Sequence, residues 1–300
     1  MKYIILFTYS LSFLLSFLIN NSYAGGKDSQ FSDIMTTSNY YGSYSLSAGQ
    51  LDWSKNGTSA DNEPMLYQPI SIDSWLGKKL TQDTEGVLSA KFTYYGRSGN
   101  IGEPEDDAIR QALNLNLLHL RHYDNSTSYI NLGYIYSEEN ETGSSNLDAN
   151  SFIVSTGLAT ESIVLEFGIG SSNTETRSYY VDEIIYYNLT YKLPISSKIN
   201  LIATKHYTEY ERKIAAISDS DGDEMDISGL KATYDLKNSF ITLGGERYTI
   251  KNGPAPEHTG GSIYFSWTLP FGKSPNSRTN FILDNRPAVD RVIGFGAAFN

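Results

Sequence analysis

Apolar residues recur at every second position along most of this 300-residue chain. One example is the segment in which Ile163, Leu165, Phe167 and Ile169 alternate with Val164, Glu166, Gly168 and Gly170. A period of two places the two sets on opposite faces of a β-strand. A soluble β-sandwich covers its apolar face with a second sheet, whereas a membrane barrel turns that face to lipid and its polar face to a wet lumen. The pattern predicts an all-β fold and leaves both architectures open.

The alternation predicts fourteen strands. Two of them are weak, because Leu66–Leu76 contains Pro69 and Thr279–Asn285 is short, and the chain has twelve strands without them. The predicted strands are Asn39–Leu51, Leu66–Leu76, Val87–Tyr95, Ala112–Tyr123, Ser128–Ser137, Ser151–Ala159, Ser162–Ser171, Ile184–Leu193, Ile199–Tyr210, Ile227–Leu236, Ser239–Ile250, Gly261–Pro270, Thr279–Asn285 and Val289–Asn300.

Short and long connections between these strands alternate, as in an antiparallel up-and-down transmembrane β-barrel with short turns at one end and long loops at the other. The short links are Asp124–Thr127, Thr160–Glu161, Pro194–Lys198 and Lys237–Asn238. The long links are Trp53–Met65, Gly96–Gln111, Glu138–Asn150, Ser172–Glu183 and Glu211–Asp226, and the last four are rich in acids. Gly77–Gly86 is long for a turn at the short-turn end. We therefore expect one barrel domain over residues 39–300 with an acidic rim of outer loops.

The first 24 residues have the pattern of a cleaved export signal. Lys2 supplies a positive charge, Tyr3–Ile19 is apolar, and Ser22 and Ala24 are small residues before the predicted cleavage site. The alternative is an uncleaved membrane anchor. Residues 25–38 are expected to form a polar lead-in to the barrel.

The composition argues against some classes of partner and excludes some kinds of site. The formal net charge is −11, which argues against nucleic acid as a partner. The chain contains no cysteine, which excludes disulfides, thiolate metal sites and a cysteine nucleophile. After the signal, no apolar run is long enough for a transmembrane helix. A membrane-spanning chain of this kind must form a closed barrel, because only helices and closed barrels satisfy their own backbone in lipid.

The polar phase of the strands predicts the residues that line the lumen. In Ala112–Tyr123 the apolar phase changes after Leu117, and a β-bulge there would turn His119 and Arg121 inward. Lys205 falls on an apolar phase and predicts a second bulge or a position near the membrane interface. The pore-lining candidates are Lys91, His119, Arg121, Glu166, Lys192, Lys231 and Asp235.

At the C-terminus, Ile293, Phe295, Ala297 and Phe299 alternate up to the last residue but one. This segment resembles the last strand of bacterial outer-membrane barrel proteins, which ends in an aromatic residue, here Phe299, followed by Asn300. With the signal and the strands, the chain resembles a porin-like outer-membrane β-barrel. The resemblance implies the outer membrane of a Gram-negative bacterium. Its implied partners are membrane lipid, lipopolysaccharide, the barrel-insertion machinery and small hydrophilic solutes.

Two motifs could indicate catalysis or metal binding. His206 and Thr208 share a strand face as the Ser/His pair of a barrel lipase would, but no third member is recognisable, and an interface histidine is the expected interpretation. Asp219, Asp221, Asp223 and Glu224 flank Gly222 in a pattern similar to a calcium loop, although a solvated acidic loop explains the same residues. Apart from this weak Ca²⁺ candidate, we expect no cofactor.

Three classes of function remain open. The first is a porin or passive diffusion channel for small hydrophilic solutes or ions, which the expected width of the barrel favours. The second is a structural or adhesive surface barrel that works through its acidic outer loops and has a closed lumen. The third, a barrel lipase or protease, is the least favoured, and we expect the chain not to be an enzyme.

Overall fold

The computed structural model describes residues 40–55, 65–97, 108–141, 147–175, 179–214, 217–251, 257–272 and 277–285. These ranges contain strands and one helix, in the order β1 (Tyr40–Lys55), β2 (Met65–Lys79), β3 (Thr84–Arg97), β4 (Ala108–His122), β5 (Thr127–Glu141), β6 (Leu147–Ala159), β7 (Ile163–Glu175), β8 (Tyr179–Pro194), β9 (Ile199–Ile214), β10 (Ile217–Asp235), β11 (Phe240–Lys251), β12 (His258–Gly272) and α3 (Ser277–Asp284).

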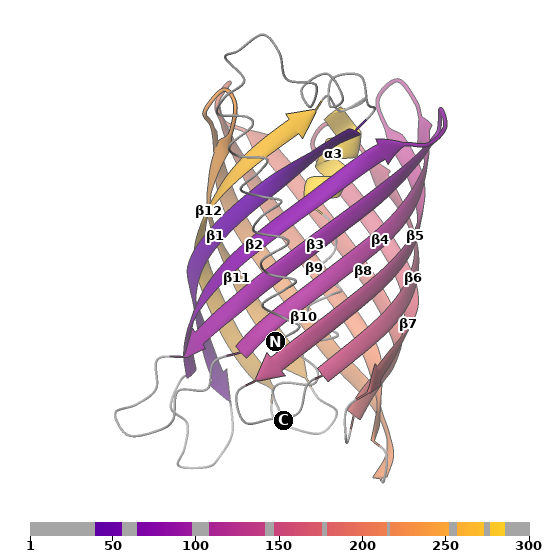
Figure 1. Cartoon of the computed structure of the whole chain (residues 1–300), viewed down its shortest axis with the longest axis vertical. Helices are drawn as coiled ribbons and strands as arrows, with labels where there is room; N and C mark the ends of the chain where they lie inside the picture. The colour runs from indigo at the N-terminus through magenta and orange to yellow at the C-terminus, as the bar shows by residue number, and fades with distance from the viewer. Residues whose placement is uncertain are drawn as a thin grey trace, which may run out of the picture.

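The twelve described strands form one closed antiparallel barrel (Figure 1). Each strand pairs with its neighbour in the chain, and β12 closes the barrel by pairing with β1 from Tyr41–Gly272 to Lys55–His258. Closure leaves no strand edge exposed, which a sheet in lipid requires. The described residues include no helix that is long and apolar enough to cross a membrane.

The strand number agrees with the twelve-strand alternative, but the strands that make it up differ. The weak strand Leu66–Leu76 is real: it is part of β2, and Pro69 is accommodated where the β1–β2 ladder is interrupted, between the pairs Ala48–Ile70 and Leu51–Tyr67. The predicted strand Thr279–Asn285 is wrong, because these residues belong to the helix α3 and the residue after it. The predicted strand Val289–Asn300, with Phe299, lies outside the described residues, as do the signal and the lead-in.

Short turns gather at one end of the barrel, which we call the short-turn end. The turns are Leu80–Asp83, Tyr123–Ser126, Thr160–Ser162, Ile195–Lys198 and Leu236–Ser239. They confirm the predicted short links, and the link after β2 is shorter than expected because β2 extends to Lys79. At the opposite end, the predicted loop Glu211–Asp226 is wrong over most of its length, since β9 continues to Ile214 and β10 begins at Ile217.

The outer face of the barrel carries an apolar belt. Exposed outward side chains include Leu46, Ile70, Leu88, Leu113, Leu132, Phe152, Leu165, Ile185, Leu230, Leu243 and Ile263. So much exposed aliphatic and aromatic surface is stable only in contact with lipid. The predicted outward phases on β3, β5, β8 and β12 are confirmed.

The β-bulge predicted near Leu117 is wrong. The β4–β5 register runs without a shift from Ala108 to His122. His119 and Arg121 are therefore exposed on the outer face close to the short-turn end, and Leu118 and Leu120 are buried inside the barrel. The bulge was inferred from the assumption that the lumen accepts only polar side chains, and this part of the lumen is apolar.

Lys205 is also accommodated without a β-bulge, because the register of β9 with both neighbouring strands is unshifted at this residue. It points outward from β9, and its ammonium group lies 2.5 Å from Asp226 Oδ1 and 3.1 Å from Ser228 Oγ on β10. An ion pair between neighbouring strands reduces the cost of placing a charge on the outer face. This arrangement explains how the lysine is accommodated on an otherwise apolar phase.

The two faces of β1 give a direct test of the membrane orientation. We predict that Leu46→Arg destabilises the membrane-inserted barrel by roughly 2–4 kcal/mol, because Leu46 is 52% exposed on the lipid-facing side. Ser47→Arg, at the next residue and facing the lumen, should cost much less. The measurement is urea unfolding of both variants in lipid vesicles, and equal destabilisation would contradict the assignment of the faces.

Candidate functional site

The interior of the barrel contains a cavity of about 700 Å³. One wall of the cavity consists of small hydroxyl side chains on β1–β3, β11 and β12. These residues are Ser43, Ser45, Ser47, Ser71, Ser89, Thr93, Thr242, Ser262, Ser266 and Thr268. Some pair across neighbouring strands: Ser71 Oγ donates to Thr93 Oγ1 at 2.9 Å, and Ser45 bonds Thr268. Such a wall is polar and uncharged, and its short side chains leave the lumen wide.

Charged groups occupy defined positions around the same cavity. Asp73 on β2 and Lys91 on β3 are directly opposite in the strand register. Lys192 and Lys231 line the other side, and Asp235 lies close to the short-turn end. Four of the seven predicted pore-lining residues are thus brought to one cavity, namely Lys91, Lys192, Lys231 and Asp235.

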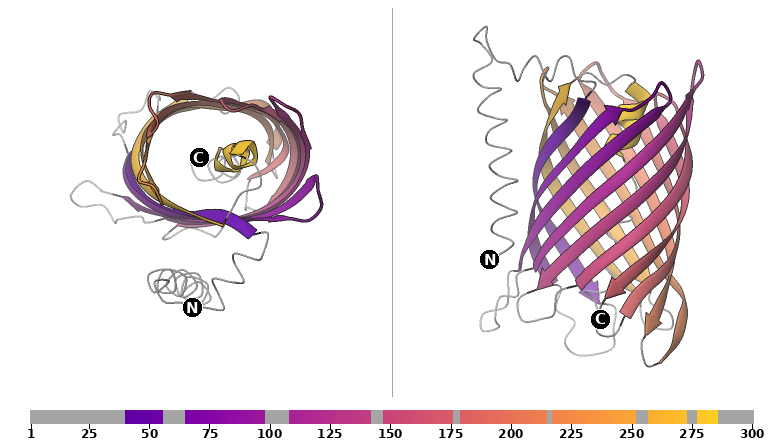
Figure 2. Two further views of the ribbon diagram at one scale, coloured as in Figure 1. Left: turned by 90° about the horizontal axis from the view of Figure 1, so that it is seen from above. Right: turned by 45° about the vertical axis from the view of Figure 1, so that its right-hand side comes forward.

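The opposite wall is covered by the helix α3, which lies inside the barrel at its short-turn end (Figure 2). Its consecutive residues Phe281, Ile282 and Leu283 are almost fully buried. They belong to an apolar cluster with Tyr41, Trp75, Val87, Leu118, Leu120, Tyr129, Ala159 and Val164 on the inner face of the barrel. The inward leucines of β4 are therefore part of the surface that holds the helix.

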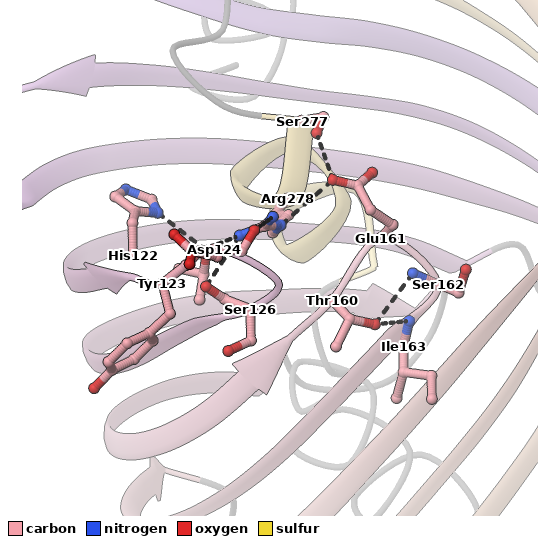
Figure 3. A network of polar contacts seen from close by, with 11 residues as sticks. His122, Tyr123, Asp124, Ser126, Thr160, Glu161, Ser162, Ile163, Ser277 and Arg278 are labelled. Carbon is pink, nitrogen blue, oxygen red and sulfur yellow. Dashed lines mark hydrogen bonds and ion pairs between the residues drawn. The ribbon is translucent and has the colours of Figure 1, made fainter.

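Arg278 connects the start of α3 to the neighbouring short turns through hydrogen bonds and an ion pair (Figure 3). Its guanidinium group donates to the backbone oxygens of Tyr123, Asp124 and Ser126 at 2.8, 2.6 and 3.0 Å. Its Nε also lies 3.4 Å from Glu161 Oε1 in the next turn. Only an arginine offers several donors in a planar fork of this kind.

The end of α3 is held by residues that point into the lumen. Trp75 Nε1 donates to Asp284 Oδ1 at 3.1 Å. Asn285, the residue after the helix, accepts hydrogen bonds from Lys231 Nζ at 2.9 Å and from Asn188 Nδ2 at 3.3 Å. Lys192 Nζ lies 4.7 Å from the centre of the Phe281 ring. Two predicted pore-lining lysines thus also position the helix.

A second apolar cluster surrounds the lumen farther from the short-turn end, and we call it the collar. It consists of Leu51, Ile135, Ala149, Ile153, Ile184, Tyr186, Tyr210, Met225, Ile227, Tyr248 and Ile250, with Tyr67 and Tyr95 packed against it. The cavity extends from the turn residues Lys237–Ser239 to Leu51, Tyr95 and Tyr248 of the collar. The lumen is therefore polar between two apolar zones.

Glu166 faces the lumen, as predicted, but it is buried and only 4% exposed. Its two carboxylate oxygens each accept a hydrogen bond at 2.7 Å, one from Tyr129 and one from Tyr186. Each tyrosine ring lies over a glycine: a Cβ on Gly157 would come within 2.3 Å of the Tyr129 ring, and one on Gly168 within 2.4 Å of the Tyr186 ring. Glu166 therefore organises the wall beside α3.

The calcium candidate is not arranged as a loop. Asp219, Asp221, Asp223 and Glu224 all lie within the strand β10. Asp223 is buried inside the barrel, whereas the neighbouring Glu224 points outward and lies 3.4 Å from Lys251 Nζ. In the part of the chain that the structure describes, no cluster of three or more His, Cys, Asp or Glu residues could hold a metal ion.

His206 and Thr208 do meet, since the Thr208 hydroxyl lies 2.7 Å from His206 Nε2. Both side chains are buried in the lumen, so the expectation of an interface histidine is wrong. The His206 ring packs at a centroid distance of 5.8 Å from Tyr186 of the collar. The packing around His206 and Thr208 indicates that their hydrogen bond has a structural role. The expectation that the chain is not an enzyme stays a prediction.

Sequence reasoning missed the helix α3 and the collar. The signal for α3 was present: Phe281, Ile282 and Leu283 are three consecutive apolar residues, which breaks the period of two, and Asn276–Ser277 before them is typical of a helix start. The collar gave no such signal, because its members come from many strands and gather only when the barrel closes.

Comparison with protein-family models and with curated proteins found no match. Solved structures share the fold. An outer membrane channel from Pseudomonas putida F1 aligns with a TM-score of 0.55 at 12% identity, over 82% of this chain and 100% of that chain.

Two further structures align less well. The translocator domain of the autotransporter NalP from Neisseria meningitidis has a TM-score of 0.40 at 10% identity, covering 80% of this chain and 92% of that chain. A BenF-like porin from Pseudomonas fluorescens Pf-5 has a TM-score of 0.40 at 9% identity, covering 78% and 99%. The likeness to the Pseudomonas putida F1 channel shows a shared β-barrel fold, and the apolar outer belt is that of a barrel that lies in lipid.

The stacking of Tyr129 on Gly157 can be tested directly. We predict that Gly157→Ala destabilises the barrel by about 1–3 kcal/mol, because the added methyl group displaces the ring and weakens its bond to Glu166. Gly261→Ala is the matched control, since its Cβ would come no closer than 3.6 Å to another atom. Equal urea midpoints for the two variants would contradict the packing described for Glu166.

Proposed function

We propose that this protein is a passive diffusion channel for small hydrophilic solutes or ions in the outer membrane of a Gram-negative bacterium. The observation that carries the proposal is the cavity of about 700 Å³, which extends from the short-turn end to the collar inside a closed barrel. Its wall of serine and threonine hydroxyls can replace water around a polar solute without binding it tightly.

The charges of the lumen support a pore with mild selectivity. Lys91, Lys192 and Lys231 contribute positive charge, and Asp73 and Asp235 contribute negative charge to the same cavity. A lumen with both signs admits solutes of either charge, whereas rings of one sign select strongly. The fold shared with the outer membrane channel of Pseudomonas putida F1 is consistent with this role.

The alternative of an adhesive or structural barrel requires a lumen that solutes do not use. Although α3 covers one wall, the cavity and its charged lining remain beside it. The described strands also leave shorter links between them than the long acidic loops on which the adhesive alternative depends. Both observations favour the channel.

A charge reversal in the lumen tests the proposal. The refolded protein should give ohmic single-channel steps in a planar bilayer. Lys91→Glu should move the reversal potential in a KCl gradient toward cation selectivity, because lumen charges in a low-dielectric wall change local ion concentrations by about ten-fold or more.

The control is Arg247→Glu, which makes the same change of charge on the outward face of β11. It should leave the reversal potential close to that of the unchanged protein. A folded and inserted protein that gives no steps would overturn the proposal, and equal shifts in both variants would show that Lys91 does not line the conducting path.

A further inference from the structure

The helix α3 occupies part of the lumen without filling it. Phe281, Ile282 and Leu283 are buried, although Phe281 and Leu283 also border the cavity, and the polar residues Asn280 and Asp284 line it with more exposed side chains. Viewed along the barrel, the helix lies inside the ring of strands (Figure 2). An α-helix with its side chains is about 10 Å wide, so its position largely sets the free width of the lumen.

The contacts that hold α3 are concentrated at its two ends. At the start, Arg278 bonds three backbone oxygens of one turn, those of Tyr123, Asp124 and Ser126. At the end, Trp75 bonds Asp284, and Lys231 bonds Asn285. A helix of eight residues is too short to be stable alone in water, so these anchors and the apolar contact determine where it lies.

We propose that α3 is the selectivity element of the channel, and that Arg278 fixes the start of the helix in the conducting path. The proposal rests on the channel function. Solutes then pass between the hydroxyl wall and the side of α3 that carries Asn280 and Asp284. The helix limits the size of the solutes, and its exposed side chains, together with Lys91 on the barrel wall, set the charge preference.

The first test changes the charge of α3 and leaves its anchors intact. Asn280→Lys adds a positive charge to the side of the helix that lines the cavity. The reversal potential in a KCl gradient should move toward anion selectivity. Ser197→Lys is the control, because it adds the same charge to an exposed turn at the same end of the barrel and should change the potential much less.

The second test releases the helix. Arg278→Ala removes the hydrogen bonds to the β4–β5 turn (Figure 3), and the single-channel conductance should rise, by up to about two-fold, as the start of a helix about 10 Å wide is freed from the wall. Larger neutral polyethylene glycols should then enter the pore and lower the conductance, whereas the unchanged protein should exclude them.

A tether can restore the position of the helix in the Arg278→Ala background. Ser277 Oγ lies 3.4 Å from Glu161 Oε1, and the chain contains no other cysteine that could react when both are replaced by Cys. Joining the two thiols with a short, reducible cross-linker should return the conductance and size limit to those of the unchanged protein. Reduction should raise both again.

The outcomes separate the two proposals. If the unchanged protein and all variants give no current, the channel function is wrong. If the unchanged protein conducts and Asn280→Lys shifts the potential no more than Ser197→Lys, the role of α3 is wrong and the channel function stands. The Asn280→Lys result decides the case even if Arg278→Ala does not fold.

Discussion

The satisfaction of backbone hydrogen bonds inside lipid is the constraint on which this structure depends. Twelve strands in the described residues meet it by closing on themselves through the β1–β12 ladder, so that no edge is left. In the closed barrel, one face of every strand contacts lipid and the other face lines the lumen. The lipid-facing positions are mostly aliphatic and aromatic, whereas the lumen-facing positions can be polar, charged or apolar.

The lumen shows how that freedom is used. Near the short-turn end, inward leucines and aromatic residues hold the helix α3, and farther along, the collar makes a second apolar zone. Between these two zones the wall consists of small polar side chains, with charged side chains at several positions along it. Glu166, held by Tyr129 and Tyr186, strengthens the wall on the side of the helix. The same inner face thus holds the helix α3 and leaves a cavity beside it.

The period of two predicted the strands and most of their outward residues, because alternation is a local property of each strand. The barrel and its antiparallel order followed only when the link lengths, the export signal and the C-terminal segment were added. The period of two was not enough for the lumen. The β-bulge predicted after Leu117 would turn Leu118 and Leu120 toward lipid, but they point inward and pack in one cluster with α3. The run from Phe281 to Leu283 carried a local helix signal, but its place inside the barrel did not follow from it, because its apolar partners lie on β1 to β7, far away in the chain. Contacts of this kind exist only in the closed barrel, and no local pattern encodes them.

The central claim is that water and small solutes reach the inner face of the barrel while lipid covers the outer face. Cysteine substitution tests it cleanly in a chain without cysteine. Ser71→Cys lies in the lumen and Ile70→Cys, at the neighbouring residue of β2, lies in the apolar belt. A small, membrane-impermeant thiol reagent added outside intact bacteria should label Ser71→Cys and leave Ile70→Cys unlabelled. Labelling of Ile70→Cys alone, or of neither residue in a folded barrel, would contradict the account.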